Sequence, residues 1–203
     1  GGIKGRLEAT GNGVCEALKE FFRHPDEVKK ANLKPNLENQ KIIIQGFGNV
    51  GLNSAKALHA NGGKIIGIAE KEGGIFSEKG IDILELENYL KENNSVMGFP
   101  GTKQIKPSSE LLIYKCDILI PAALENAITL QNVDKIQAKL ICEAANGPVS
   151  YRADKKLQEK GTAIIPDIYA NGGGVTVSYF EWIRNISHIR MGRLNKRYEE
   201  HRG

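Results

Sequence analysis

The chain has 203 residues, of which 40% are hydrophobic and 26% are charged, and its formal net charge is +4. This length can bury a substantial core, and the composition is that of an ordinary globular protein. Because the positive excess is small and the two signs are interspersed, the composition does not favour a nucleic-acid-binding protein.

The first predicted element is an N-terminal helix over residues 5–22. Its apolar face repeats at helical spacing, with Leu7, Val14, Leu18 and Phe21. A second, narrower face has small and polar side chains, namely Arg6, Thr10, Gly13 and Ala17. The small residues indicate either close packing on a neighbouring helix or room for a ligand, toward which Arg6 and Thr10 would point. Residues 23–39, with two prolines, are predicted to be a polar connection.

The next segment predicts a dinucleotide-binding turn. An apolar strand from Lys41 ends in Gly46-Phe47-Gly48-Asn49-Val50-Gly51, and a helix is predicted over 50–61. Gly46 permits a tight turn, Gly48 lets the backbone approach a diphosphate, and Gly51 lets helix and strand pack closely. The helix N-terminus offers backbone N–H groups to phosphates. A second apolar run ends at Glu70, whose carboxylate can accept hydrogen bonds from both hydroxyls of the adenosine ribose.

The rest of the chain alternates predicted helices and strands. We expect a turn at 73–74, a helix over 82–92, a loop over 97–109, strands at 117–121, 140–144 and 163–166, a helix over 152–160, and a C-terminal helix from about 175 toward 197. This alternation predicts an α/β fold of the Rossmann-like, doubly wound type, with a mostly parallel sheet and helices on both faces.

Ligands of such folds bind beyond the carboxyl ends of the strands. The predicted strand ends carry Ala122 and Ala123, which would let a ring lie against backbone, and two asparagines. Asn146 and Asn171 each offer a donor and an acceptor, which suits a carboxamide or a ribose hydroxyl, although Asn-Gly is also common in turns. On the last helix, Ser178 could bind a carboxylate near the positive helix end, or it could bond its own backbone.

No metal site or disulfide framework is predicted. The three cysteines are far apart without a C-x-x-C pair, and the four histidines lack metal-ligand spacing. Reduced, buried thiols are therefore expected. No apolar run approaches the roughly 20 residues needed to cross a bilayer. Together these features predict a soluble intracellular protein that does not bind membranes.

Several segments, in this order, resemble the cofactor domain of glutamate dehydrogenases. They are Gly2-Ile3-Lys4-Gly5-Arg6 with Ala9-Thr10-Gly11-Asn12-Gly13-Val14, the Gln45–Gly51 turn, Asp117–Ala123, Glu143–Pro148 and Asn171–Val175. The stretch Val175–Trp182, with Gly192-Arg193-Leu194, resembles the animal-type enzymes in particular. The resemblance covers the chain from residue 2 to about 197.

The resemblance implies oxidative deamination of L-glutamate to 2-oxoglutarate and ammonia, with hydride transfer to a nicotinamide. The implied substrate-pocket residues are Arg6, Asn171, Val175 and Ser178. The implied cofactor-binding residues are Thr10, Gly46, Phe47, Gly48, Asn49, Val50, Gly51, Glu70, Ala122, Ala123, Asn146 and Asn171. The carboxylate of Glu70 favours NAD over NADP, while the adjacent Lys71 could offset that preference and animal-type relatives can use both.

No part of the chain resembles the family's N-terminal substrate domain, which carries the catalytic lysine and aspartate. We therefore assign no catalytic acid or base, treat residues 1–203 as one dinucleotide-binding domain, and expect the chain alone to bind nucleotide without turnover. The family implies a homohexamer, in the mitochondrial matrix if eukaryotic and otherwise in the cytoplasm. Two alternatives stay open: the cofactor domain of a leucine, phenylalanine or valine dehydrogenase, against which Ser178 argues, and a non-catalytic nucleotide-binding module.

Overall fold

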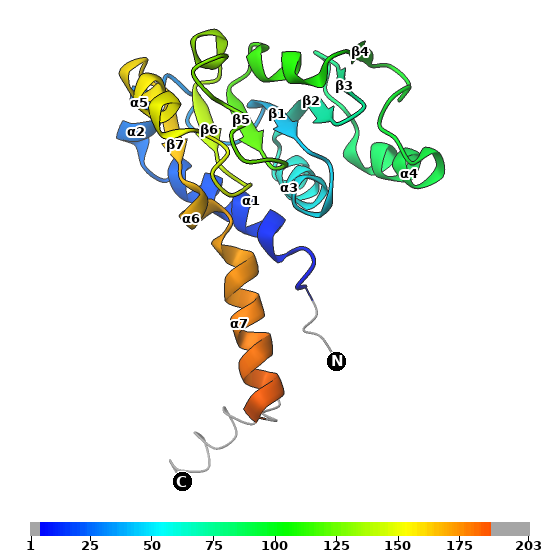
Figure 1. Cartoon of the computed structure of the whole chain (residues 1–203), viewed down its shortest axis with the longest axis vertical. Helices are drawn as coiled ribbons and strands as arrows, with labels where there is room; N and C mark the ends of the chain where they lie inside the picture. Colours follow the sequence, from blue (N-terminus) through cyan, green and yellow to red (C-terminus); the bar gives the residue numbers. More distant parts are fainter. Residues whose placement is uncertain (1–4, 188–203) are drawn as a thin grey trace.

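A seven-stranded sheet forms the centre of the computed structural model, which describes residues 5–187 (Figure 1). The strands are β1 (Lys41–Gln45), β2 (Lys64–Glu70), β3 (Gly73–Phe76), β4 (Lys103–Ile105), β5 (Ile118–Pro121), β6 (Leu140–Cys142) and β7 (Ala163–Ile165). Their order is β4-β3-β2-β1-β5-β6-β7, and the run from β2 through β7 in that order is parallel. β3 pairs antiparallel with β2, and β4 with β3. The predicted α/β fold with a mostly parallel sheet is confirmed.

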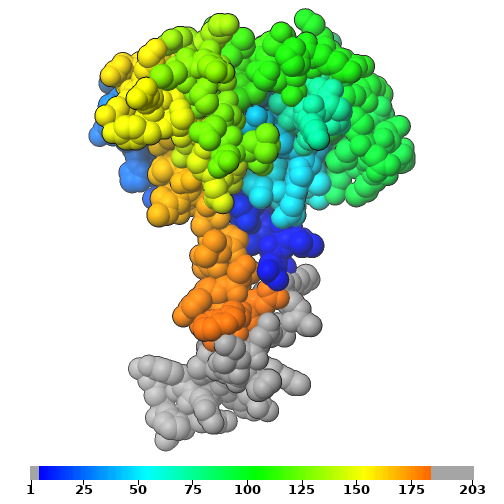
Figure 2. Space-filling view, viewed as in Figure 1, coloured from blue at the N-terminus to red at the C-terminus, as the bar shows by residue number. Residues whose placement is uncertain are grey.

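Helices cover both faces of this sheet. The α-helices are α1 (Ala9–Phe22), α2 (Pro25–Lys30), α3 (Asn49–Ala60), α4 (Ile83–Asn93), α5 (Tyr151–Glu159), α6 (Asp167–Ala170) and α7 (Gly172–Ser187), and the 3-10 helices are η1 (Ser108–Ile113) and η2 (Val133–Lys135). Helix α7 extends away from the sheet (Figure 1), and the space-filling view shows the beginning of the described chain beside it (Figure 2).

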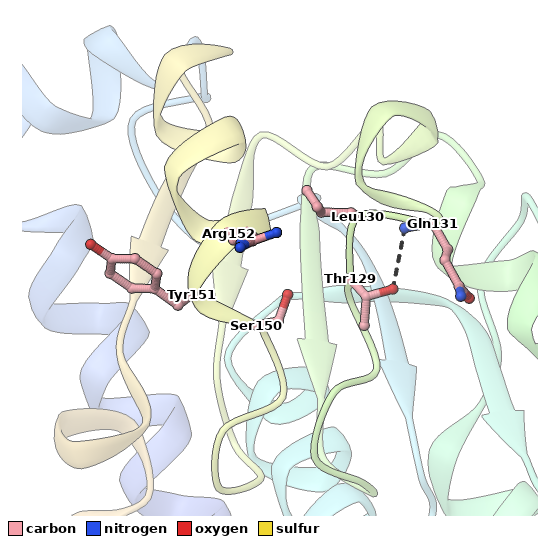
Figure 3. Close-up of a pocket in the computed structure, with 6 residues that line it drawn as sticks. All are labelled: Thr129, Leu130, Gln131, Ser150, Tyr151 and Arg152. Atoms are coloured by element: carbon pink, nitrogen blue, oxygen red, sulfur yellow. Dashed lines mark hydrogen bonds between the residues drawn. The ribbon is translucent and has the colours of Figure 1, made fainter.

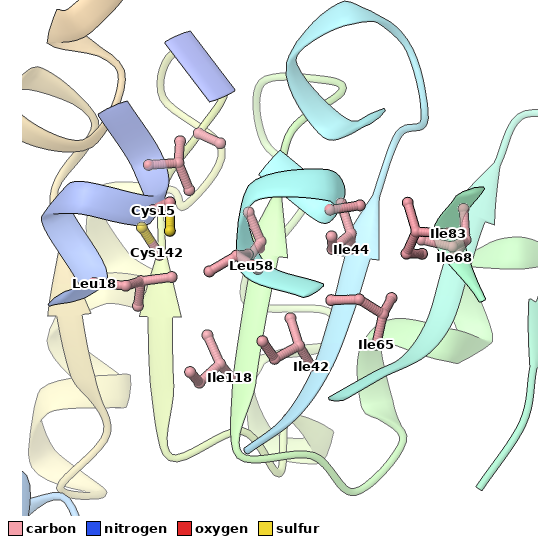
Figure 4. Packing of buried hydrophobic residues seen from close by; sticks show 14 of the residues in the cluster. Cys15, Leu18, Ile42, Ile44, Leu58, Ile65, Ile68, Ile83, Ile118 and Cys142 are labelled. Carbon is pink, nitrogen blue, oxygen red and sulfur yellow. The ribbon is translucent and has the colours of Figure 1, made fainter. Parts of the chain in front are cut away.

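The core lies in two layers because side chains alternate along each strand. Ile42 and Ile44 of β1 pack with Leu18 of α1 and Leu58 of α3 on one face (Figure 4). Ile43 points to the other face, where η1, η2 and α5 cover it. Burial of both faces explains why the central strands read as continuous apolar runs rather than as alternating patterns.

The three cysteines are free and buried, as predicted. Burial raises the pKa of the Cys116 thiol to about 12 and also raises the pKa values of Cys15 and Cys142. These thiols therefore stay protonated inside the core at neutral pH. Within residues 5–187, no helix is both long enough and apolar enough to cross a bilayer.

Five local predictions differ from the structure. The N-terminal helix begins at Ala9 rather than at residue 5, and Leu7, which precedes it, is 71% exposed instead of lying on its apolar face. The predicted connection over 23–39 contains α2, whose Pro25 occupies a first-turn position that needs no N–H. The predicted loop over 97–109 contains β4 and the start of η1.

The fourth difference concerns Gly73 and Gly74, which open β3 instead of forming a turn. A Cβ atom on residue 74 would lie 2.2 Å from Cδ1 of Leu111 in η1. Gly74 therefore lets η1 pack on the strand, whereas a Cβ on Gly73 would lie 2.7 Å from the sulfur of Met97. The last helix begins at Gly172, before the expected residue 175, and its predicted continuation toward 197 lies outside the described residues, as do 1–4 and the Gly192-Arg193-Leu194 motif.

Candidate functional site

A cavity of about 710 Å³ lies at the carboxyl edge of the sheet. The chain leaves β1 toward β2 on one side, while β5 pairs with β1 on the other, so this is the point at which strand order reverses. The cavity is lined by Arg6, Leu7, Thr10, Asn49, Val50, Ala122, Ala123, Ala144, Ala145, Asn146, Asn171, Gly174, Val175 and Ser178. All four residues predicted for the substrate pocket are among them.

The glycine turn between β1 and α3 borders this cavity. Gly46 adopts φ +89°, and a Cβ there would lie 2.8 Å from the Cβ of Ala123. A Cβ on Gly51 would lie only 1.9 Å from the carbonyl oxygen of Gly46, so both glycines are required by the protein's own backbone and packing.

Gly48 is different, because neither backbone nor packing demands a glycine there. Its φ of −73° suits any residue, and a Cβ would have no atom within 4 Å. Open space above a bare backbone fits a group that approaches the main chain closely, as a diphosphate does. No side chain caps the first turn of α3, so its backbone N–H groups face that space as anion donors.

Glu70 at the end of β2 is bonded to the glycine turn. One carboxylate oxygen accepts from the backbone N–H of Phe47, and the other accepts from the N–H of Lys71 at 3.2 Å. The Phe47 side chain is 3% exposed and lies in the core. Among the residues predicted to bind phosphate, Phe47 therefore has a buried side chain and a backbone N–H that is already bonded to Glu70.

Asn49 also has a structural partner. Its Nδ2 donates to the carbonyl oxygen of Leu7 at 2.8 Å, which ties the segment before α1 to the start of α3. Asn53, one turn later, donates to the same carbonyl at 3.4 Å. These bonds hold the backbone that carries Arg6 beside the glycine turn.

The two predicted asparagines meet directly. Nδ2 of Asn171 donates to Oδ1 of Asn146 at 2.7 Å, although 25 positions separate them in the chain. Nδ2 of Asn171 also donates to the carbonyl oxygen of Ala145 at 3.5 Å. These two bonds leave Nδ2 of Asn146 and Oδ1 of Asn171 for other partners. Behind them Glu143 is 8% exposed, and burial raises its pKa while backbone N–H groups of Asp167 and Val149 favour its charged form.

Arg6 lines the cavity and forms an ion pair that the sequence did not reveal. Its Nη1 lies 2.7 Å from Oε2 of Glu181 in α7, whose side chain is 12% exposed. Glu181 stands three positions after Ser178 and thus on a neighbouring part of the same helix surface. The signal available in the sequence was an acidic residue at that spacing, among the aromatic residues Tyr179, Phe180 and Trp182.

Two glycines of α1 serve helix packing, while Thr10 lines the cavity. A Cβ on Gly11 would lie 2.5 Å from the Cβ of Asn53 in α3, and the Cβ position of Gly13 is 3.4 Å from Cα of Gly173 in α7. A Cβ on Gly174 would lie 2.2 Å from Oγ1 of Thr10. Close packing on a neighbouring helix is therefore confirmed for this face, whereas a ligand beside Arg6 and Thr10 stays a prediction.

Figure 3 shows a second hollow, between the segment after β5 and the start of α5. It is lined by Thr129, Leu130, Gln131, Ser150, Tyr151 and Arg152. None of the predicted site residues belongs to it. In the described part of the chain, no group of three or more His, Cys, Asp or Glu side chains could hold a metal ion.

Comparisons with known proteins show the family of this chain. Residues 1–200 match the family model of Glutamate/Leucine/Phenylalanine/Valine dehydrogenase. The chain is 50% identical to the mitochondrial glutamate dehydrogenase of Dictyostelium discoideum, over 98% of this chain and 40% of that protein. It is 45% identical to the NAD-specific glutamate dehydrogenase of Peptoniphilus asaccharolyticus, over 91% of this chain and 43% of that protein.

Solved structures give the same result for the fold. The crystal structure of the hetero-hexameric glutamate dehydrogenase of Thermus thermophilus, in its Leu-bound form, matches with a TM-score of 0.82 and 26% identity. The match covers 98% of this chain and 45% of that chain. The chain thus spans less than half the length of the relatives it matches. Its sequence, its fold and its family-model match together show that it belongs to the Glutamate/Leucine/Phenylalanine/Valine dehydrogenase family.

Proposed function

We propose that this chain is the NAD-binding portion of a glutamate dehydrogenase. The observation that carries the proposal is the cavity at the carboxyl edge. It brings Arg6, Asn171, Val175 and Ser178, expected to hold an amino-acid substrate, next to residues expected to hold a dinucleotide. The names of the similar proteins support glutamate as the substrate.

The fit of a dinucleotide rests on Gly48 and the start of α3. The unfilled Cβ position of Gly48 and the uncapped first turn offer space and N–H donors to a diphosphate. Ala122 and Ala123 offer a surface without long side chains, and Asn146 and Asn171 offer amide groups to the nicotinamide end. The bound nicotinamide would supply the carbon that accepts a hydride.

The substrate side of the cavity has one cationic group and one hydroxyl. Arg6 would bind a carboxylate, and the hydroxyl of Ser178, in the second turn of α7, would donate to one. Val175 would pack against the substrate's carbon chain. A leucine, phenylalanine or valine substrate would have no second carboxylate, so a polar group at position 178 favours glutamate over those substrates.

Glu70 carries the proposed preference for NAD. Its carboxylate accepts hydrogen bonds from the ribose hydroxyls of NAD but repels the 2′-phosphate of NADP. The neighbouring Lys71 is exposed and can reduce that repulsion. We infer NAD as the preferred nucleotide, with NADP binding more weakly.

The catalytic acid and base are proposed to lie in the part of the protein outside this chain, which spans 40% to 45% of its relatives. The whole protein would act on L-glutamate to give 2-oxoglutarate and ammonia. It would assemble as a homohexamer, and it would be mitochondrial if its source is eukaryotic and cytoplasmic otherwise. The chain alone would bind nucleotide without turnover.

The test compares the full-length protein with the chain. Full-length protein should form NADH in the presence of L-glutamate, whereas the chain should bind NADH in calorimetry and form none. L-Leucine and L-phenylalanine serve as competing substrates for the family alternatives. Nucleotide binding without turnover by the full-length protein would instead support a non-catalytic module, and absence of nucleotide binding would refute the proposal.

A further inference from the structure

Two segments at the carboxyl edge exchange hydrogen bonds through their carboxylates. Oε2 of Glu143, just after β6, accepts from the backbone N–H of Asp167 in α6 at 3.0 Å. In return, Oδ2 of Asp167 accepts from the backbone N–H of Gly147 at 2.8 Å. Each side chain thus holds the main chain of the other segment.

We propose that Glu143 and Asp167 are positioning residues that hold Asn146 and Asn171 for the nicotinamide end of a bound dinucleotide. We refer to this pair of reciprocal bonds as the Glu143–Asp167 clasp. The inference rests on the proposed function, because it concerns the same cavity. The two carboxylates would position Asn146 and Asn171, whereas the glycine turn would bind the diphosphate and the substrate residues would bind the amino acid.

The clasp binds a backbone N–H in the second half of the turn, where the carbonyl oxygens of Gly147 and Pro148 already accept from other backbone N–H groups. The N–H groups of Ala144 and Ala145 both bond the carbonyl oxygen of Pro121, which anchors the first half to β5. The second half contains Gly147, in the left-handed conformation at φ +53°, and its N–H is bonded by Asp167. Asn146 lies between these two anchors.

The same clasp fixes Asn171. Its backbone N–H donates to the carbonyl oxygen of Asp167 at 2.9 Å, so α6 carries it at a set distance from the residue that Glu143 holds. The hydrogen bond of 2.7 Å between the side-chain amides of Asn171 and Asn146 then links the two segments a third time. Because both asparagines line the cavity, a shift of either segment changes the spacing of their free amide groups there.

Because Glu143 is buried, water cannot easily replace its carboxylate as the acceptor for the backbone N–H of Asp167. The residue is 8% exposed, and a buried N–H left without an acceptor is costly. A carboxylate is also a stronger acceptor than an amide. Removal of the Glu143 side chain should therefore loosen the segment that carries Asp167. A glutamine of equal size at position 143 should keep part of the hydrogen bond.

The test uses the full-length protein and two nucleotides, NADH and ADP-ribose, which lacks the nicotinamide. Glu143→Ala and Asp167→Ala should each weaken NADH binding about tenfold in calorimetry and leave ADP-ribose binding within about twofold, as expected for loss of a charge-assisted hydrogen bond. Glu143→Gln and Asp167→Asn should recover part of the NADH affinity. Glu110→Ala, which removes an exposed carboxylate in η1, is the control.

Amide hydrogen exchange gives a readout that does not depend on the nucleotide. Peptides that contain Gly147 and Asp167 should exchange faster in both alanine variants than in wild type. Equal weakening of NADH and ADP-ribose, or no change in either, would overturn the positioning role. If wild-type protein binds no nucleotide, the proposed function fails instead, and unchanged exchange at Gly147 and Asp167 would then overturn the clasp by itself.

Discussion

Arg6 and Glu181 form an ion pair with Nη1 and Oε2 2.7 Å apart, and it joins the segment before α1 to the middle of α7. The arginine side chain is 54% exposed and the glutamate side chain 12% exposed. Glu181 therefore acts as the fixed partner and Arg6 as the one that reaches the cavity. This asymmetry leads to the first prediction.

Glu181→Gln should raise the KM for L-glutamate of the full-length protein about tenfold, because Arg6 loses a charge-assisted partner that orients it. NADH affinity, measured by calorimetry, should stay unchanged. Glu16→Gln removes an exposed carboxylate that pairs with Lys19 at 2.9 Å and serves as the control. A fall in KM would contradict the prediction, since it would mean that Glu181 competes with the substrate for Arg6.

Gly48→Ala should mainly weaken nucleotide binding, whereas Gly51→Ala should mainly lower the stability of the fold. The first puts a methyl group into open space, so unfolding free energy should change by no more than about 1 kcal/mol, the usual cost of alanine at a helix N-cap. NADH binding should nevertheless weaken at least about tenfold, because the methyl group blocks close approach to the backbone.

Gly51→Ala would place a Cβ 1.9 Å from the carbonyl oxygen of Gly46 and should lower the melting temperature strongly. Thermal unfolding and calorimetry on both variants separate the two effects. Unchanged NADH affinity in Gly48→Ala would place the diphosphate away from this turn.

Glu70→Gln should shift nucleotide preference. The amide keeps an acceptor for the Phe47 N–H but loses the charge that repels a 2′-phosphate. We expect the ratio of NADP to NAD dissociation constants to fall about tenfold, measured by calorimetry. Glu72→Gln changes a nearby exposed carboxylate and should leave the ratio as it is. A ratio equal to that of wild type in Glu70→Gln would show that Glu70 does not select the nucleotide.

The buried thiol of Cys116 predicts a pH effect on stability. Its pKa is raised by burial from an ordinary value of 9.0 to about 12, so the native state keeps a proton that the unfolded chain releases. The stabilisation is complete below pH 9 and is lost as pH rises toward about 12. Urea titrations between these pH values should show a smaller fall in unfolding free energy for Cys116→Ala than for wild type. Equal slopes would contradict the prediction.

The order of elements around the glycine turn was predictable because its signals are local. Turn chemistry, strand periodicity and the acidic residue after β2 lie within one short stretch of chain. β3 and β4 were missed because both are short strands that pair antiparallel, with β4 at the edge of the sheet. Gly73-Gly74 also looks the same in a turn as in a strand whose Gly74 lies under Leu111.

The site was predictable as a set of residues but not as a set of contacts. Asn146 and Asn171 follow different predicted strands, so each could be named, whereas their mutual bond depends on how α6 packs. The same holds for Arg6 and Glu181, which are distant in sequence. Glu143 and Asp167 were not singled out, because a carboxylate that bonds a distant backbone N–H has no spacing rule.

The contact between Thr10 and Gly174 has an evolutionary consequence. A Cβ at position 174 would collide with Oγ1 of Thr10 at 2.2 Å but would sit 3.5 Å from its Cβ, an ordinary contact. The obstacle to a Cβ at position 174 is therefore the hydroxyl of Thr10. Homologous sequences that replace this glycine should lack a γ-oxygen at position 10, so the two positions should covary.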